Sequence, residues 1–181
     1  MKTALIFLLV TFFHATIVAQ SPATISVERE QKIKKDIEKE ISKLEIELKK
    51  AKVNILEIEF TLDTFRIELL YEKHIAIIYS DFGMRDANYE TARLYDSLLN
   101  KYYKKLLATL KEDNKKVLIR AQKSWIIFRD TEFSLVETIS KDEYAGGGTM
   151  QQLTESSAYL NLVKSRTVAI FDHYARATQN E

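Results

Sequence analysis

The chain has 181 residues, with 27 Lys and Arg against 26 Asp and Glu, and it contains no cysteine. This near-neutral balance argues against nucleic acid or an anionic membrane surface as a partner, and the lack of cysteine excludes disulfides as a source of stability. The length suits one ordinary domain with an appendage, and the few glycines and the single proline mark the boundaries between segments.

Residues 1–19 have the pattern of a secretory signal peptide. Lys2 precedes a nearly unbroken apolar run, and the small residue Ala19 stands at the expected cleavage point. A membrane anchor is the alternative, but the uncharged run of about 17 residues is shorter than the roughly 20 of a spanning helix, and no cationic cluster follows it. We therefore predict an exported protein, periplasmic or extracellular, without a membrane span after signal removal.

Residues 26–80 contain a heptad pattern. Apolar residues at alternating steps of four and three run from Ile37 to Leu69, which predicts one long, coiled-coil-like helix without a break. Within it, residues 56–69 also alternate between apolar and polar side chains, as a strand would. We favour helix there, because both flanks are helical and a lone strand would have no partner.

The remaining chain predicts an up-and-down bundle of three antiparallel helices at residues 84–175. Gly83 is suited to end the preceding helix, and residues 113–114 offer a tight turn and an N-cap between the first and second helices of the bundle. Thr149 is expected to cap the third helix, with Gln152 reaching back to its start. The predicted fold class is therefore all-α, with the long helix preceding the bundle.

The second helix of this bundle contains residues 121–132, AQKSWIIFRDTE, which hold the only tryptophan. Steps of three and four predict its buried face, which consists of Leu118, Ala121, Trp125, Phe128, Leu135 and Ile139. Glu132 falls on that face, where an unpaired carboxylate would cost several kcal/mol. We therefore predict that Glu132 forms an ion pair with Arg129 or Arg166.

Two groups of residues are candidates for function. The first is a polar network that either fixes helix register or forms part of a recognition surface: Asn100, Gln122, Trp125, Arg129, Asp130, Glu132 and Arg166. The second is a flexible loop able to approach a partner closely: Asp142, Glu143, Tyr144, Gly146, Gly147, Gly148 and Thr149. Because there is no cysteine nucleophile, and His74 and His173 lack the spacing of metal ligands, we predict no catalytic residue, no metal and no cofactor.

Four motifs follow one another in the second half of the chain: Tyr95-Asp-x-x-Leu-Asn100-x-x-Tyr103, residues 121–132, Gly146-Gly-Gly148 and Arg166-Thr167. Together they resemble the N-terminal domain of the LprI-like lysozyme-inhibitor family of exported bacterial proteins, over about residues 82–175. The resemblance implies an all-helical periplasmic or surface module that inhibits lysozyme. Family members commonly carry cysteines where this chain has Ala87, Phe133 and Ala158, so apolar packing is expected to replace a disulfide.

The expected domain plan has four parts: a signal peptide at 1–19, a helical segment at 26–80, an LprI-like domain at 82–175 and a disordered tail at 176–181. The leading hypothesis is a non-enzymatic protein-binding module of the bacterial envelope, with a lysozyme or another muramidase as its partner. The alternative is a structural or assembly protein that forms homo-oligomers through the heptad helix. An inhibitor of a cationic lysozyme would benefit from an acidic face, which a neutral composition does not reveal.

Overall fold

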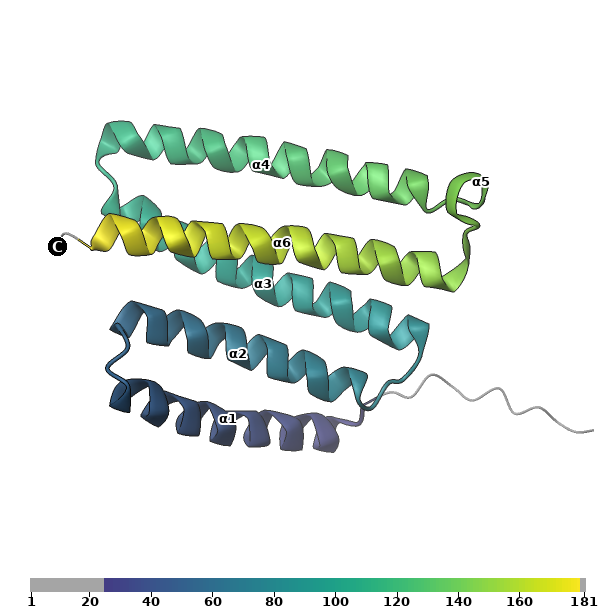
Figure 1. Ribbon diagram of the computed structural model, residues 1–181, viewed down its shortest axis with the longest axis horizontal. Coiled ribbons are helices and arrows are strands. Elements are labelled where there is room, and N and C mark those ends of the chain that lie inside the picture. The colour runs from purple at the N-terminus through teal and green to yellow at the C-terminus, as the bar shows by residue number, and fades with distance from the viewer. Residues whose placement is uncertain (1–24, 180–181) are drawn as a thin grey trace, which may run out of the picture.

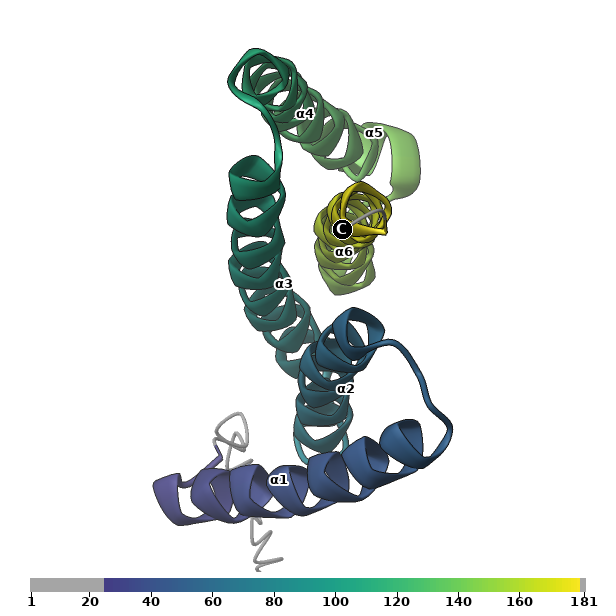
Figure 2. The same ribbon diagram turned by 90° about the vertical axis from the view of Figure 1, so that its left-hand side faces the viewer.

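The computed structural model describes residues 25–179, and within them the chain forms helices and no strand. The helices are α1 (Val27–Lys50), α2 (Ile55–Ile75), α3 (Asp81–Thr109), α4 (Glu112–Ile139), α5 (Asp142–Ala145) and α6 (Gly148–Thr178). The five long helices run back and forth along the molecule, with α1, α3 and α6 pointing one way and α2 and α4 the other (Figure 1), and α1 crosses the other helices obliquely (Figure 2). The predicted all-α class is confirmed, while the predicted signal peptide lies outside the described residues.

The main core lies between α3 and α6, and α2 closes one side of it. One face of α3 is buried in this core, and it consists of Tyr95, Leu98, Leu99, Tyr102 and Leu106. They meet Val163, Thr167 and Ile170 of α6, which are also buried. Each large apolar side chain buried in this way stabilises the fold by about 1.5–3 kcal/mol relative to leaving it in water.

Ion pairs as well as apolar contacts hold α2 on this core. Glu59 and Asp63 of α2 lie 2.5–2.8 Å from the Nζ atoms of Lys101 and Lys105 of α3. These side chains remain partly exposed, so each pair contributes at most about 1 kcal/mol. The opposite side of α2 packs on α1. Because α2 is packed on two sides, apolar residues are needed on both, and this explains the alternation of apolar and polar side chains along residues 56–69. The strand alternative for residues 56–69 is therefore wrong, because the whole segment is helical.

The single long helix predicted for residues 26–80 is wrong, because the chain turns back between α1 and α2. Lys52 takes a left-handed conformation with φ 56°, and the side chain of Asn54 caps α2 by accepting the backbone N–H of Leu56 at 2.8 Å. Most of the heptad seam is thereby packed within one chain, where Ile37 and Ile41, together with Ile33, pack on Leu62, Phe65 and Leu69. The seam residues are not available for the oligomer that the sequence suggested.

We expect Lys52→Gly to raise the free energy of unfolding by about 0.5–1 kcal/mol, because glycine enters the left-handed region without a Cβ clash. Urea unfolding followed by circular dichroism measures the change. Lys35→Gly is the control, since Lys35 is exposed within α1 and glycine there should lower the free energy of unfolding by about 1 kcal/mol. A loss of stability in both variants would show that the turn at Lys52 is not left-handed.

Helix α4 lies outside the main core. It packs along α6 and is joined to α3 only at one end, so that it forms an edge of the molecule (Figure 2). Leu118 is its one buried residue, and Trp125 is partly buried against the core. The short link between α3 and α4 does make them antiparallel, but α6 is the neighbour that α4 contacts most.

The face of α4 that was predicted to be buried is mostly exposed. Phe128, Leu135 and Ile139 each keep more than half of their surface in solvent, and Ala121 is exposed as well. The predicted face joins two neighbouring stripes: Leu118 and Trp125 turn toward α6 and the core, whereas the stripe through Phe128 faces solvent. Spacing identifies the stripes but not which of them has a partner.

Helix ends differ from the sequence predictions in three places. Gly83 does not end a helix but lies in the first turn of α3, where Ser80 accepts its N–H at 3.1 Å. A Cβ on Gly83 would lie 1.9 Å from the Cγ2 atom of Ile78, so the close approach explains the glycine. Residues 113–114 lie within the first turn of α4, and residues 176–178 belong to α6 rather than to a disordered tail.

Candidate functional site

One end of the molecule brings together the start of α3, the end of α4, α5 and the start of α6 (Figure 1). The connection uses three glycines with positive φ, Gly146, Gly147 and Gly148, at 77°, 60° and 84°. Gly147 also lies close to α5, since a Cβ there would be 1.6 Å from the Oδ1 atom of Asp142. Because side chains would be strained or would clash, the tight reversal depends on these glycines.

Hydrogen bonds fix this loop to the helices around it. The Thr149 hydroxyl donates to Asp81 Oδ2 at 2.9 Å, and the Gln151 amide donates to the Ala145 carbonyl at 3.0 Å. The predicted capping role of Thr149 is wrong, because Gly147 occupies the N-cap of α6. Gln152 accepts from Arg85 of α3 at 2.9 Å instead of reaching back to its own helix.

The loop presents an aromatic residue beside carboxylates. Tyr144 is 62% exposed, and Asp142 and Glu143 are exposed next to it on α5. Met150 on α6 and Phe82 on α3 are also largely exposed at this end. All seven residues of the predicted partner loop therefore lie at one end of the bundle.

Charge is segregated along the long axis, although the chain as a whole is nearly neutral. Within α3 to α6, the half that carries the loop comprises residues 81–95 and 126–163, with nine acidic and four basic residues, a net charge of −5. The opposite half of the same helices, residues 96–125 and 164–178, has four acidic and eleven basic residues, a net charge of +7 with histidine neutral. We call the first of these the acidic end.

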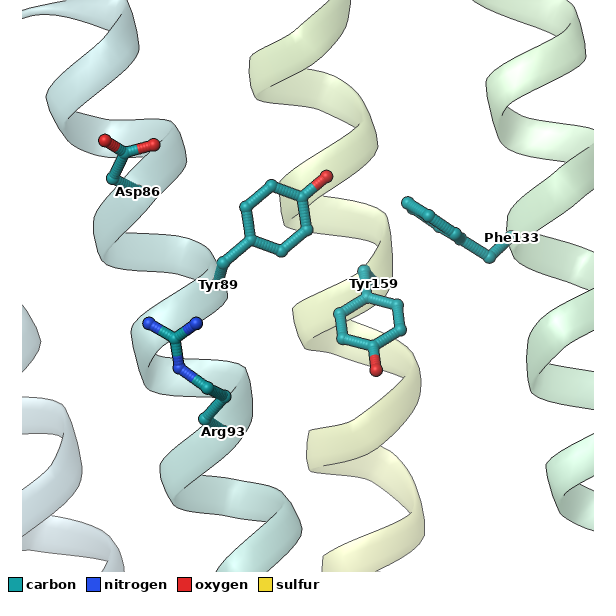
Figure 3. Close-up of a pocket in the computed structure, with 5 residues that line it drawn as sticks. All are labelled: Asp86, Tyr89, Arg93, Phe133 and Tyr159. Carbon is teal, nitrogen blue, oxygen red and sulfur yellow. The ribbon is translucent and has the colours of Figure 1, made fainter.

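An aromatic groove of about 690 Å³ lies in the acidic end, between α3, α4 and α6 (Figure 3). Tyr159 of α6 lies between Tyr89 of α3 and Phe133 of α4, with ring centroids 6.1 and 5.1 Å away. Asp86 and Arg93 line the same groove from α3. The combination of aromatic rings with one carboxylate and one guanidinium suits the binding of a side chain from a protein partner.

The pKa of Tyr89 is raised, first by burial and then by the negative charges of Glu155 and Glu137. The groove therefore lies in the negative potential of the acidic end. Sequence reasoning missed it because Tyr89, Phe133 and Tyr159 lie outside the stripes that were assigned to the core. A count of charge along each helix would have found the acidic end.

The predicted polar network is only partly assembled. Arg166 donates to Gln122 Oε1 at 3.0 and 3.1 Å, and the guanidinium groups of Arg129 and Arg166 lie 5.4 and 5.7 Å from the centroid of the Trp125 ring. Burial lowers the pKa of Arg166. These contacts join α4 to α6, which favours the reading that the network fixes helix register.

Two members of the predicted network lie elsewhere. Asn100 is exposed and donates to Asp96 on its own helix at 3.2 Å. The predicted ion pair of Glu132 is wrong, since Arg129 pairs with Asp130 at 2.6 Å and Arg166 binds Gln122. Glu132 is only partly buried, so a carboxylate there keeps contact with water and needs no cation.

Tyr95 links three helices of the core. Its hydroxyl donates to Glu68 of α2, its backbone carbonyl accepts from Thr167 of α6 at 3.1 Å, and Glu68 also pairs with Lys164 at 2.6 Å. Burial, followed by the hydrogen bond and charge of Glu68, raises the pKa of Tyr95 far above its usual range.

We expect the free energy of unfolding to fall steeply above about pH 10. The unfolded chain ionises its tyrosines near pH 10, whereas folded Tyr95 keeps its proton, so its contribution is present below that pH and is lost as the pH rises further. The loss should approach about 1.4 kcal/mol per pH unit for this one group. Urea unfolding from neutral to strongly alkaline pH measures it. Tyr95→Phe should show a shallower fall, and equal slopes in both proteins would contradict the assignment to Tyr95.

Among the described residues no group of His, Asp and Glu side chains is arranged to hold a metal ion. In the same part of the chain, no helix has the length and apolar character needed to cross a membrane.

Comparison with known proteins gives one finding. A protein-family model described as "Lysozyme inhibitor LprI" matches residues 78–169, which are 92 of the 181 residues. The matched region contains α3, α4, α5 and most of α6. No curated protein and no solved structure matches the chain.

Proposed function

Because this chain belongs to the lysozyme inhibitor LprI family, we propose that it is an exported, non-enzymatic module that binds and inhibits a lysozyme or another cationic muramidase. The acidic end is the proposed docking surface, and α1 and α2 are a support for α3 rather than part of that surface. The site of action would be the bacterial envelope or its surroundings.

The segregation of charge carries this proposal. A net charge of −5 at one end attracts a basic enzyme and orients it before contact, which raises the association rate. The +7 at the other end repels the same partner. The approach is therefore directed to the loop and the groove, even though the mature chain has almost no net charge.

The proposed contact residues are placed on a fixed framework. Thr149 and Gln151 tie the loop to α3 and α5, so little conformational freedom is lost when a partner binds. Tyr144 is exposed beside two carboxylates and suits the role of an aromatic anchor. The groove at Tyr159 would accept a side chain from the partner next to this anchor.

Inhibition of purified lysozymes tests the proposal. Mature protein in tenfold excess is added to a suspension of peptidoglycan with c-type, g-type or i-type lysozyme, and clearing is followed by turbidity. We expect slower clearing with at least one class, and weaker inhibition at high salt, because screening reduces the attraction between the acidic end and the enzyme. Unchanged clearing with every class, from a sample whose folding is confirmed by circular dichroism, would overturn the proposal.

A further inference from the structure

The aromatic groove between α3, α4 and α6 has walls made of three rings, each on a different helix. The rings of Tyr89 and Phe133 are inclined by 52° and 63° to that of Tyr159, so neither stacks on it. All three side chains are partly exposed, and the groove that they line has a volume of about 690 Å³. Space of this size accepts a long side chain together with the backbone that carries it. Aromatic walls attract a side chain that ends in a cation.

Two carboxylates lie beside these rings. Glu137 follows Phe133 by one turn of α4, and Glu155 precedes Tyr159 by one turn of α6, so each carboxylate shares a helix face with a ring. Because α4 and α6 run in opposite directions (Figure 1), both carboxylates lie on the side of the loop. After burial, which is the largest cause, the charges of Glu155 and Glu137 raise the pKa of Tyr89. Both carboxylates therefore act on the groove.

The arginines around the groove are bonded to other carboxylates. The pairs are Arg85 with Asp86, Arg93 with Glu90 and Arg129 with Asp130. Figure 3 shows the guanidinium of Arg93 turned away from the ring of Phe133. Lys141 is exposed beyond the end of α4, and within the described part of the chain neither Glu137 nor Glu155 forms an ion pair. Negative charge beside the rings is thus left for a cation from outside.

From the three rings and the two unpaired carboxylates we propose that the aromatic groove binds an arginine side chain of a basic protein. The planar guanidinium lies against the rings, and its N–H groups donate toward Glu137 and Glu155. Arginine suits the groove better than lysine, because a guanidinium stacks on aromatic rings and is more weakly hydrated than an ammonium group. The inference rests on the proposed function for the identity of the protein that presents the arginine, whereas binding of a free arginine derivative does not depend on it.

Titration with Nα-acetyl-L-arginine methylamide tests the site, since the guanidinium is the only charge of this probe. The ring resonances of Tyr89, Phe133 and Tyr159, followed by NMR at low salt, should shift to saturation at millimolar probe. The matching citrulline derivative has the same shape without the charge and should bind about tenfold more weakly. The matching lysine derivative should bind about threefold more weakly. Absence of any shift, or equal binding of the arginine probe and either other derivative, would overturn the proposal.

Two variants locate the binding on the groove. Glu137→Gln, Glu155→Gln keeps the shape of both side chains and should weaken binding of the arginine probe by about tenfold at low salt. Glu112→Gln, Asp113→Asn removes the same charge near the opposite end of α4 and should leave the dissociation constant within about twofold of wild type. Tyr159→Leu, with folding checked by circular dichroism, should abolish the shifts. Equal weakening in both charge variants would show attraction to the whole chain and would contradict a site in the groove.

The probe and the clearing assay can fail independently. If the arginine probe binds the groove and no lysozyme is inhibited, the arginine site is supported and the proposed function is overturned. If a lysozyme is inhibited equally by wild type and by the folded Tyr159→Leu variant, and the probe does not bind, the arginine site is overturned and the proposed function stands.

Discussion

Truncating Tyr102 to alanine should lower the free energy of unfolding by about 3–5 kcal/mol. Its ring is fully buried and meets Phe60 and Phe171 edge-on, with both centroid distances at 5.2 Å. Phe60 and Phe171 themselves stack at 3.9 Å. The substitution leaves a cavity at the point where α2, α3 and α6 meet, so all three helices lose packing. Urea unfolding at neutral pH measures the loss.

Two variants separate this packing effect from others. Tyr102→Phe should cost only about 0.5–1.5 kcal/mol, because it removes one hydroxyl, which donates to Asp63 at 3.3 Å. Trp125→Ala should cost clearly less than Tyr102→Ala, since Trp125 is only partly buried at the edge of the core. If the tryptophan variant were the less stable of the two, the core would lie at α4 rather than between α3 and α6.

The double variant Asp142→Lys, Glu143→Lys should weaken the proposed inhibition of lysozyme by more than about tenfold at low salt. Both side chains are exposed on α5 beside Tyr144, and the change shifts the net charge of the acidic end from −5 to −1. Most of the loss should appear in the association rate, and inhibition by the variant should no longer fall as salt is added. Clearing assays over a range of salt concentrations measure both effects.

Glu112→Lys, Asp113→Lys is the matched control. It makes the same change in total charge, at two highly exposed carboxylates near the opposite end of α4. Inhibition by this variant should stay within about twofold of wild type, because charges farther from the contact than the Debye length of about 10 Å are screened. Equal losses in both double variants would show that total charge, rather than the acidic end, controls the encounter.

Much of the helical pattern could be predicted from spacing, but the turn between α1 and α2 could not. The seam residues Ile37 and Leu69 do lie on packed faces, as the heptads indicated. The turn between them contains neither glycine nor proline, and Lys52 adopts a left-handed conformation that its residue type rarely takes. The packing of α1 on α2 stabilises a turn that local sequence preferences would not select.

The residues of the candidate site could be predicted from the sequence, but the way in which the fold brings them together could not. The three successive glycines predicted a loop, and the loop does lie at one end of the molecule. Glu132 does lie on the side of α4 that faces α6, where it lines a shallow pocket with Val136 and Asn161, but this side stays partly open to water and the carboxylate needs no cation. Which side of a two-striped helix is buried depends on contacts with a distant segment, here α6, and periodicity within one helix carries no information about them.

The pairing of α3 with α6 has a consequence for how the chain reaches its native state. Contacts between them join residues far apart in sequence, with Asn88 and Ser156 separated by 68 positions and Tyr95 and Thr167 by 72. The α1–α2 hairpin closes over a short loop and can form early. The apolar face of α3, by contrast, stays uncovered until α6, the last helix, is available to pack on it. A chain that crosses a membrane from its N-terminus would therefore expose the apolar face of α3 until translocation is nearly complete, and during that interval it would be a substrate for chaperones and proteases.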